Sequence, residues 1–189
     1  MLNGEDYRSL KPAPGFMLEV LFDEELDPAD TQRLSTIVWS KPWLDGPYGH
    51  PAEADSDEFK PGDPGERELE FGRALLSSKI VGVSFHVLPQ ERICSLAVHA
   101  YAVLPGLHGS RQLVNEVVAG FRGIGTEMLH RPHAHAAIIG EEASIAGSLT
   151  PFTGNPVFAK HGDWGTGWPD ARGAGVTWFL DGFETKAWL

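Results

Sequence analysis

The chain has 189 residues, of which 42% are hydrophobic, and it carries a formal net charge of −11 at pH 7. This length and apolar content suffice for one large domain, or for a domain with an extension. The charge argues against direct binding to nucleic acid or to an anionic membrane, because both need a basic surface. No apolar run is long enough to span a bilayer.

The net negative charge of the chain comes entirely from its first third. Residues 1–70 contain 17 acidic and 6 basic residues, whereas residues 71–189 contain 9 of each. A surface field of one sign attracts surfaces of the opposite sign. We therefore expect the first third to face a basic partner.

The N-terminal sequence and the cysteine content indicate a cytoplasmic protein. Residues 1–6 lack the basic region and the apolar stretch of a signal peptide. Cys94 is the only cysteine, so no internal disulfide can form. It lies in an apolar segment, and we interpret it as a small buried hydrophobic residue and not as a catalytic thiolate.

The first two elements are predicted by local patterns. Residues 16–22 alternate apolar and other side chains, as a strand with one buried face does. Asp27 and Pro28 then favour the N-cap and first position of a helix. An apolar stripe follows, and Pro42 ends the helix. The carboxylates that flank this helix start are candidates for partner binding: Asp23, Glu24 and Glu25.

Residues 41–66 interrupt the periodic pattern. They contain five prolines and four glycines, which are typical of loops. We expect a long acidic loop or a mobile insertion here. Its carboxylates Asp55, Asp57 and Glu58 are further candidates for contact with a basic partner.

The middle of the chain predicts a hairpin, a helix and a further strand. Residues 80–88 and 93–104 alternate strictly around a turn. Ser110 is suited to cap a helix with apolar residues at helical spacing as far as Ile124. Residues 134–139 read as the last strand. Three glycines lie near the end of the helix, and we interpret them as its C-terminal cap and not as a phosphate loop: Gly120, Gly123 and Gly125.

The element order, strand–helix–strand–strand–helix–strand, predicts a ferredoxin-like α+β domain over residues 1–150. Two helices would cover one face of an antiparallel sheet. Residues 151–189 form a Gly-rich extension with 8 of the chain's 19 aromatic residues, and a strand is possible at 176–180. The extension either covers the bare face of the sheet or offers anchors to a partner. Trp164 and Trp168, expected on an irregular loop, are the candidate anchors.

Two histidines separated by one residue suggest a metal site. Side chains at positions i and i+2 of a strand share a face, as metal coordination requires, so His133 and His135 qualify. Alternation places His99 and Glu19 on that face as well, and imidazoles with a carboxylate suit a divalent metal.

The segment containing His133 and His135 resembles the paired-histidine motif of rolling-circle replication nickases and plasmid relaxases. The resemblance implies a metal-dependent enzyme with a tyrosine nucleophile. This sequence departs from that pattern in two respects. No tyrosine follows Tyr101, and the basic surface that holds DNA is missing.

The overall character of the chain resembles that of immunity proteins from bacterial polymorphic and type VI secreted toxin systems. They are compact, acidic, Trp-rich α+β proteins without a catalytic set. The resemblance implies a protein without a cofactor that inhibits a basic toxin: its carboxylates imitate phosphates, and Trp side chains anchor the contact. The alternatives are the metal-dependent enzyme and an assembly or scaffold subunit.

Overall fold

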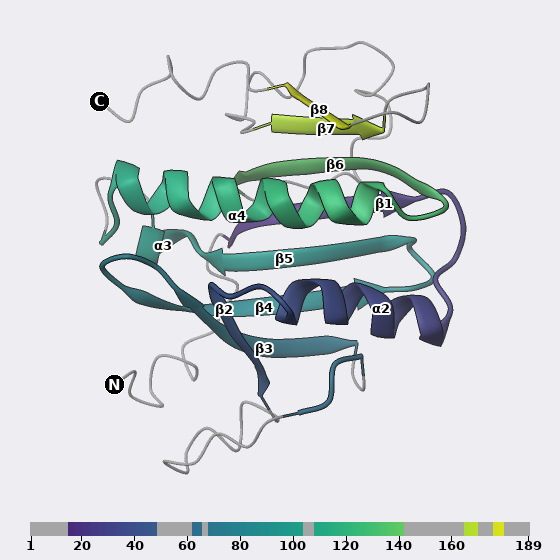
Figure 1. Cartoon of the computed structure of the whole chain (residues 1–189), viewed down its shortest axis with the longest axis horizontal. Coiled ribbons are helices and arrows are strands. Elements are labelled where there is room, and N and C mark those ends of the chain that lie inside the picture. The colour runs from purple at the N-terminus through teal and green to yellow at the C-terminus, as the bar shows by residue number, and fades with distance from the viewer. Residues whose placement is uncertain are drawn as a thin grey trace.

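A computed structural model of the chain describes residues 15–48, 62–65, 68–103, 108–141, 165–169 and 176–179. The described residues form one antiparallel sheet with two long helices packed on one face (Figure 1). The predicted antiparallel α+β class is therefore confirmed. Four candidate partner residues lie outside the described part: Asp55, Asp57, Glu58 and Trp164.

The strands are β1 (Gly15–Phe22), β2 (Leu44–Tyr48), β3 (Leu69–Leu75), β4 (Ile80–Leu88), β5 (Ile93–His99), β6 (Ala134–Glu141), β7 (Gly165–Pro169) and β8 (Val176–Phe179). The helices are α2 (Pro28–Trp39), α3 (Ala100–Val103) and α4 (Arg111–Leu129). The sheet order is β2-β3-β4-β5-β1-β6-β7-β8, and every neighbouring pair is antiparallel.

This strand order departs from the predicted ferredoxin-like arrangement. Strands β2 and β3 lie between α2 and β4 in the chain and extend the sheet beyond β4. Strands β7 and β8 come from the predicted extension and continue the sheet beyond β6. Trp168 is thus part of a strand and not of an irregular loop, because the backbone of β7 pairs with both β6 and β8.

Three further expectations were wrong. The insertion at 41–66 contains a strand, because Leu44 is buried and pairs with Ala74 of β3. The second strand of the hairpin ends at His99, where the chain turns into α3. The three glycines do not cap α4 but lie inside it, since α4 continues to Leu129.

The predicted helix starts are confirmed. The Asp27 side chain accepts a hydrogen bond from the Asp30 amide at 2.7 Å, with Pro28 in the first helical turn. The Ser110 hydroxyl accepts one from the Leu113 amide at 3.2 Å. Each cap satisfies a backbone N–H that has no partner inside the helix.

The main core lies between the helices and the sheet. Phe16 of β1 and Phe121 of α4 are both fully buried, and their rings stack with centroids 6.0 Å apart. A smaller cluster lies on the other face of the sheet, where Leu21, Ile93 and Ile138 are buried. The apolar alternation of β1, β4 and β5 therefore supplies much of the sheet side of the main core.

Glu70 is a buried polar group that joins three segments. Its side chain is 3% exposed and lies under α2. One carboxyl oxygen accepts hydrogen bonds from Ser35 Oγ at 2.6 Å and Trp39 Nε1 at 2.8 Å, and the other accepts one from the Gly65 amide at 2.6 Å. Gly65 has a φ of 79°, and a Cβ there would lie 2.3 Å from Gln32 Cα, so glycine is required.

We expect Glu70→Ala to lower the free energy of unfolding by roughly 3 kcal/mol, because it leaves at least two buried donors without an acceptor. Urea unfolding followed by tryptophan fluorescence measures this. Glu68→Ala is the control, because Glu68 lies two residues before Glu70 and is exposed. It should change the free energy of unfolding by less than about 0.5 kcal/mol. Equal losses in the two variants would contradict the role of Glu70.

Gly120 allows close approach of the segment after α2 to helix α4. A Cβ built on Gly120 would lie 2.5 Å from the Trp43 ring, which also packs against Phe121 at a centroid distance of 6.2 Å. Three residues further along α4, a Cβ on Gly123 would meet nothing within 4 Å. The two glycines share a helix but differ in surroundings.

Alanine should therefore have opposite effects at these two positions. Gly120→Ala should destabilise the protein by about 1–3 kcal/mol, because the rigid indole must move. Gly123→Ala should stabilise it by about 0.5–1 kcal/mol through helix propensity. Thermal unfolding of the two variants shows whether each is more or less stable than the unmodified protein. A change in melting temperature in the same direction for both would refute the close contact.

Candidate functional site

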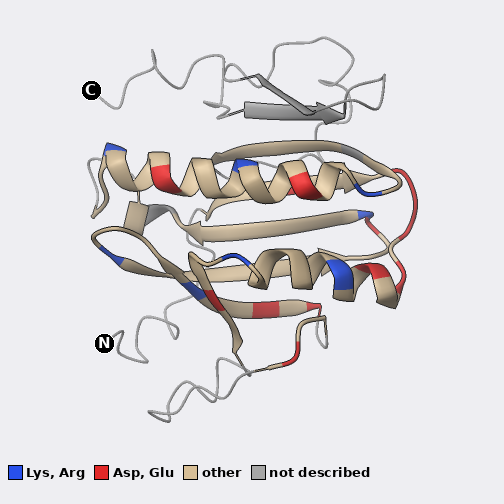
Figure 2. Cartoon of the chain, in the orientation of Figure 1, with Lys and Arg blue, Asp and Glu red and all other residues tan. Residues whose placement is uncertain are grey.

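The acidic connection between β1 and α2 forms one end of the molecule. Four of its five residues, at positions 23–27, carry carboxylates, and all four are exposed. Figure 2 shows this connection in red beside the N-terminal end of α2. This places Asp23, Glu24 and Glu25, three of the predicted partner residues, side by side on one surface.

Hydrogen bonds to two neighbouring turns hold the backbone of this connection. The Asp23 amide donates to the His133 carbonyl at 2.7 Å, and Arg92 Nη1 donates to the Asp23 carbonyl at 3.1 Å. The Leu26 amide donates to the Pro89 carbonyl at 3.4 Å. The carboxylates are therefore carried on a fixed scaffold.

Basic side chains are interleaved with these carboxylates. Arg33 pairs with Asp30 at 3.1 Å, and His133 Nδ1 lies 3.3 Å from Glu24 Oε1. All four side chains are largely exposed, so each pair contributes little to stability. The surface is acidic in balance but contains charges of both signs.

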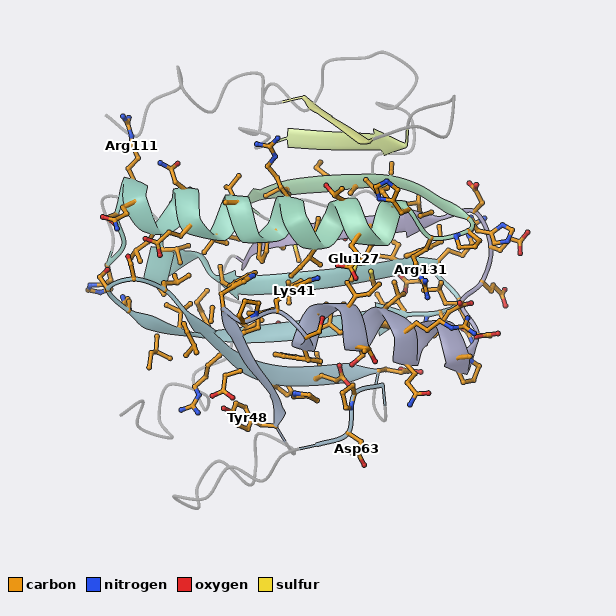
Figure 3. All side chains as sticks on the ribbon, viewed as in Figure 1. Lys41, Tyr48, Asp63, Arg111, Glu127 and Arg131 are labelled. Atoms are coloured by element: carbon orange, nitrogen blue, oxygen red, sulfur yellow. The ribbon has the colours of Figure 1, made fainter. Side chains whose placement is uncertain are left out.

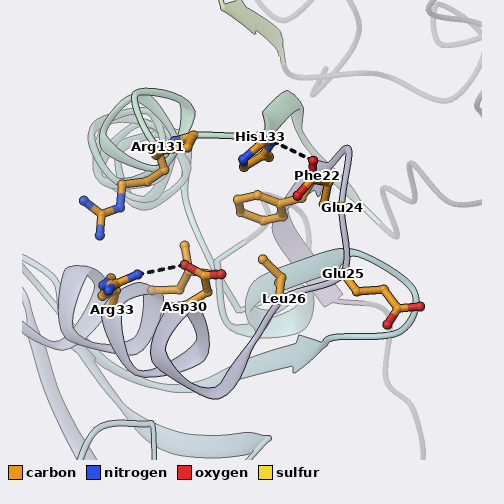
Figure 4. A pocket seen from close by; sticks show the side chains of 10 residues that line it. Phe22, Glu24, Glu25, Leu26, Asp30, Arg33, Arg131 and His133 are labelled. Atoms are coloured by element: carbon orange, nitrogen blue, oxygen red, sulfur yellow. Dashed lines mark hydrogen bonds and ion pairs between the residues drawn. The ribbon is translucent and has the colours of Figure 1, made fainter.

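A cavity of about 280 Å³ opens at this end, between the start of α2 and the turn before β6. Phe22, Leu26 and Leu34 contribute its apolar lining. Its charged lining is shown in Figure 4: Glu24, Glu25, Asp30, Arg33, Arg131 and His133. No local pattern in the sequence indicates this cavity, because its lining comes from segments about 100 residues apart.

A larger groove of about 570 Å³ runs between α2 and α4. Arg33 and Arg131 line both spaces, so the groove and the cavity share a wall. Lys41, just after α2, forms an ion pair with Glu127 of α4 (Figure 3). The groove thus has charged side chains along both helices.

The structure does not bring the predicted metal ligands together. His99 lies opposite Gly15 at one end of β1, whereas Ala134, beside His133, lies opposite Phe22 at the other end. Seven residues of strand separate these ends by roughly 23 Å. His133 itself is in the turn before β6, with a φ of 65°, and is not on the sheet.

Glu19 lies in the middle of β1, on the sheet face opposite the helices, and is 7% exposed. Its direct neighbour in β5 is Ser95, which pairs in turn with His86. His135 lies where the register between β1 and β6 shifts, and its side chain is outside the described part. Within the described residues, no group of three potential metal ligands occurs.

A polar cluster that the sequence did not predict lies on β2 and β3. Arg73 Nη2 donates to Asp45 at 2.8 Å and to the Tyr48 hydroxyl at 2.6 Å, and its guanidinium lies 5.0 Å from the Tyr48 ring centroid. Partial burial and the hydrogen bond to Asp45 raise the pKa of Tyr48. The cluster ties the edge strand β2 to β3.

Cys94 is buried between β5 and α4. It is 1% exposed, and its sulfur lies 3.7 Å from Met128 Sδ. Burial, and to a smaller extent the charge of Glu19, raise the pKa of the thiol far above its usual range. This confirms its interpretation as a buried apolar residue, because the reactive species of cysteine is the thiolate.

Comparison with protein-family models, curated proteins and solved structures finds no match for this chain. Among the described helices, none is both long and apolar enough to cross a membrane. The function must therefore be inferred from the chemistry of the surface itself.

We expect Cys94 to be inert toward Ellman's reagent in the native protein, even at pH 9, because burial and its raised pKa keep it as a thiol. Unfolding in urea should expose one reactive thiol per chain. The rate of colour development, with and without urea, measures this. Fast reaction under native conditions would show that Cys94 is accessible.

Proposed function

We propose that this protein binds and neutralises a basic protein partner, in the way that immunity proteins inhibit bacterial toxins. The observation that supports this best is the acidic connection between β1 and α2. Its carboxylates are exposed, and its backbone is fixed by hydrogen bonds to the β4–β5 turn and to the turn before β6. No catalytic role is required of it, and it would act in the cytoplasm.

A fixed acidic surface suits this function for an energetic reason. Association costs free energy when flexible segments become ordered, and a connection that is already ordered avoids part of this cost. Opposite charges also accelerate encounter and select the orientation in which the partners meet. Toxins that act on nucleic acid need a basic surface, so carboxylates spaced along one segment would imitate the phosphates.

The proposal includes the ferredoxin-like description of the central part. Strands β4, β5, β1 and β6 are neighbours in that order, and α2 and α4 lie on one face. We take these elements as a ferredoxin-like unit in which β2 and β3 form an insertion. Because that fold supports many functions, the proposed function depends on the surface and not on the fold.

Charge reversal at the acidic connection tests the proposal. Glu24→Lys with Glu25→Lys should lower the association rate by about tenfold at low salt and flatten its dependence on ionic strength. The dissociation rate should change less. A pull-down from the native cell supplies the partner, and surface plasmon resonance at several salt concentrations measures both rates.

The matched control is Asp63→Lys with Glu116→Lys, which alters the net charge equally; Glu116 of α4 bonds to Ser77 in the β3–β4 turn, at the opposite end of the sheet from the acidic connection. It should leave most of the association rate intact. Unchanged kinetics for the Glu24 and Glu25 variant would overturn the proposal. So would equal losses in both variants, or pull-downs that recover no basic protein.

A further inference from the structure

The large hydrophobic side chains that are exposed in the described part of the chain all lie on one face of the β3–β4 hairpin. They are Leu69, Leu75 and Ile80, which are 41%, 43% and 49% exposed. Leu75 pairs directly with Ile80 across the two strands. Because side chains alternate along a strand, these three lie on the face opposite the buried Glu70 and Val81, and therefore away from α2.

A polar cluster lies on the same face of the hairpin. Arg73 lies in β3 between Leu69 and Leu75, and its guanidinium donates to Asp45 at 2.8 Å and to Tyr48 at 2.6 Å. Tyrosine and arginine are the residue types that often carry the binding energy of an interface, and exposed apolar groups gathered on one surface mark a site of interaction. We call this surface the hairpin face; it is formed by Asp45, Tyr48, Leu69, Arg73, Leu75 and Ile80.

The hairpin face is separate from the acidic connection. Val83 of β4 lies level with Val98 of β5, which lies level with Phe16 of β1. Ile80, three residues before Val83, is therefore near the end of the sheet where β1 begins. The acidic connection follows Phe22, at the other end of β1. A partner bound to the acidic connection leaves the Leu75 and Ile80 end of the hairpin face open.

Charge favours a second copy of the chain as the occupant of the hairpin face. The net charge of −11 makes two copies repel each other, so they can associate only through a surface without excess charge. On the hairpin face Arg73 and Asp45 neutralise each other. A two-fold contact uses the same surface of both copies, so a face with one acid and one base complements itself.

The edge of the sheet beside this face is poorly suited to association by strand addition. In the edge strand β2, Pro47 has no amide hydrogen to donate, and its carbonyl already accepts a hydrogen bond from the Gly62 amide at 2.9 Å. A second copy is therefore expected to pack on the face of the hairpin and not to continue its sheet.

We propose that this protein forms a two-fold symmetric dimer in which the hairpin faces of two copies pack against each other. Leu75 and Ile80 of each copy supply the apolar contact. Arg73 of each copy lies against Asp45 of the other, so that the charges alternate across the interface. This inference uses a surface that the proposed function does not, and each is tested without the other.

Sedimentation velocity of the full chain, over a concentration range of about 1 μM to 1 mM, tests the inference. We expect the average mass to rise from that of one chain to that of two. Amide shifts of the ¹⁵N-labelled chain over the same dilution series should change for residues 69–75 and 80–88, and not for residues 23–27.

Two double variants isolate the apolar contact: Leu75→Val with Ile80→Val, and Leu75→Thr with Ile80→Thr. Valine and threonine have similar shapes and both favour strands, so the two variants differ chiefly in the hydrophobicity of the hairpin face. The valine variant should retain the dimer, and the threonine variant should weaken it by about tenfold or more. Circular dichroism checks that both variants are folded.

A single-chain mass at every concentration would overturn the inference. So would equal dimer affinities of the two double variants, or dilution shifts confined to residues 23–27. A monomeric chain whose valine variant retains a protein from the native cell, when its threonine variant does not, would also overturn it, because the hairpin face would then bind a different partner.

Discussion

The carboxyl group of Glu70 is the contact on which the arrangement of α2 depends. It is buried where the helix crosses the sheet, and it joins the helix, strand β3 and the turn at Gly65 through three hydrogen bonds. A buried polar group without partners is costly, so only one placement of the helix satisfies all three donors. Helix α2, which follows the acidic connection, is positioned on the sheet by this contact.

Two indole rings set how closely the layers approach. Trp39 donates to Glu70 and lies against Gly72, where a Cβ would be 2.3 Å from the ring. Trp43 lies in the same way against Gly120 of α4. Because each ring occupies the space of an absent side chain, α2 and α4 are held at fixed positions on the sheet. Arg33 and Arg131 then line the groove and the cavity from different elements.

At the acidic end, the fold places basic side chains beside a segment that the sequence predicts to be negatively charged. The charges of residues 23–27 alone would favour any basic surface. The fold adds Arg33, Arg131 and His133 from other segments, so that positive and negative groups alternate over short distances. A partner must match this pattern and not only the net charge, which is how electrostatic complementarity provides specificity.

Several elements could be predicted from the amino-acid sequence because their signals are local. The alternation of residues 16–22, the Asp27 and Ser110 caps and the hairpin of β4 and β5 depend on neighbouring residues only. Strand β3 was missed because its buried positions hold Glu70, Gly72 and Ala74, while Leu69 and Leu75 are exposed. Trp39 and Ser35 of α2 cover this inverted pattern. The cavity and the separation of His133 from His99 likewise depend on contacts between distant segments, and such contacts leave no periodic signal in the sequence.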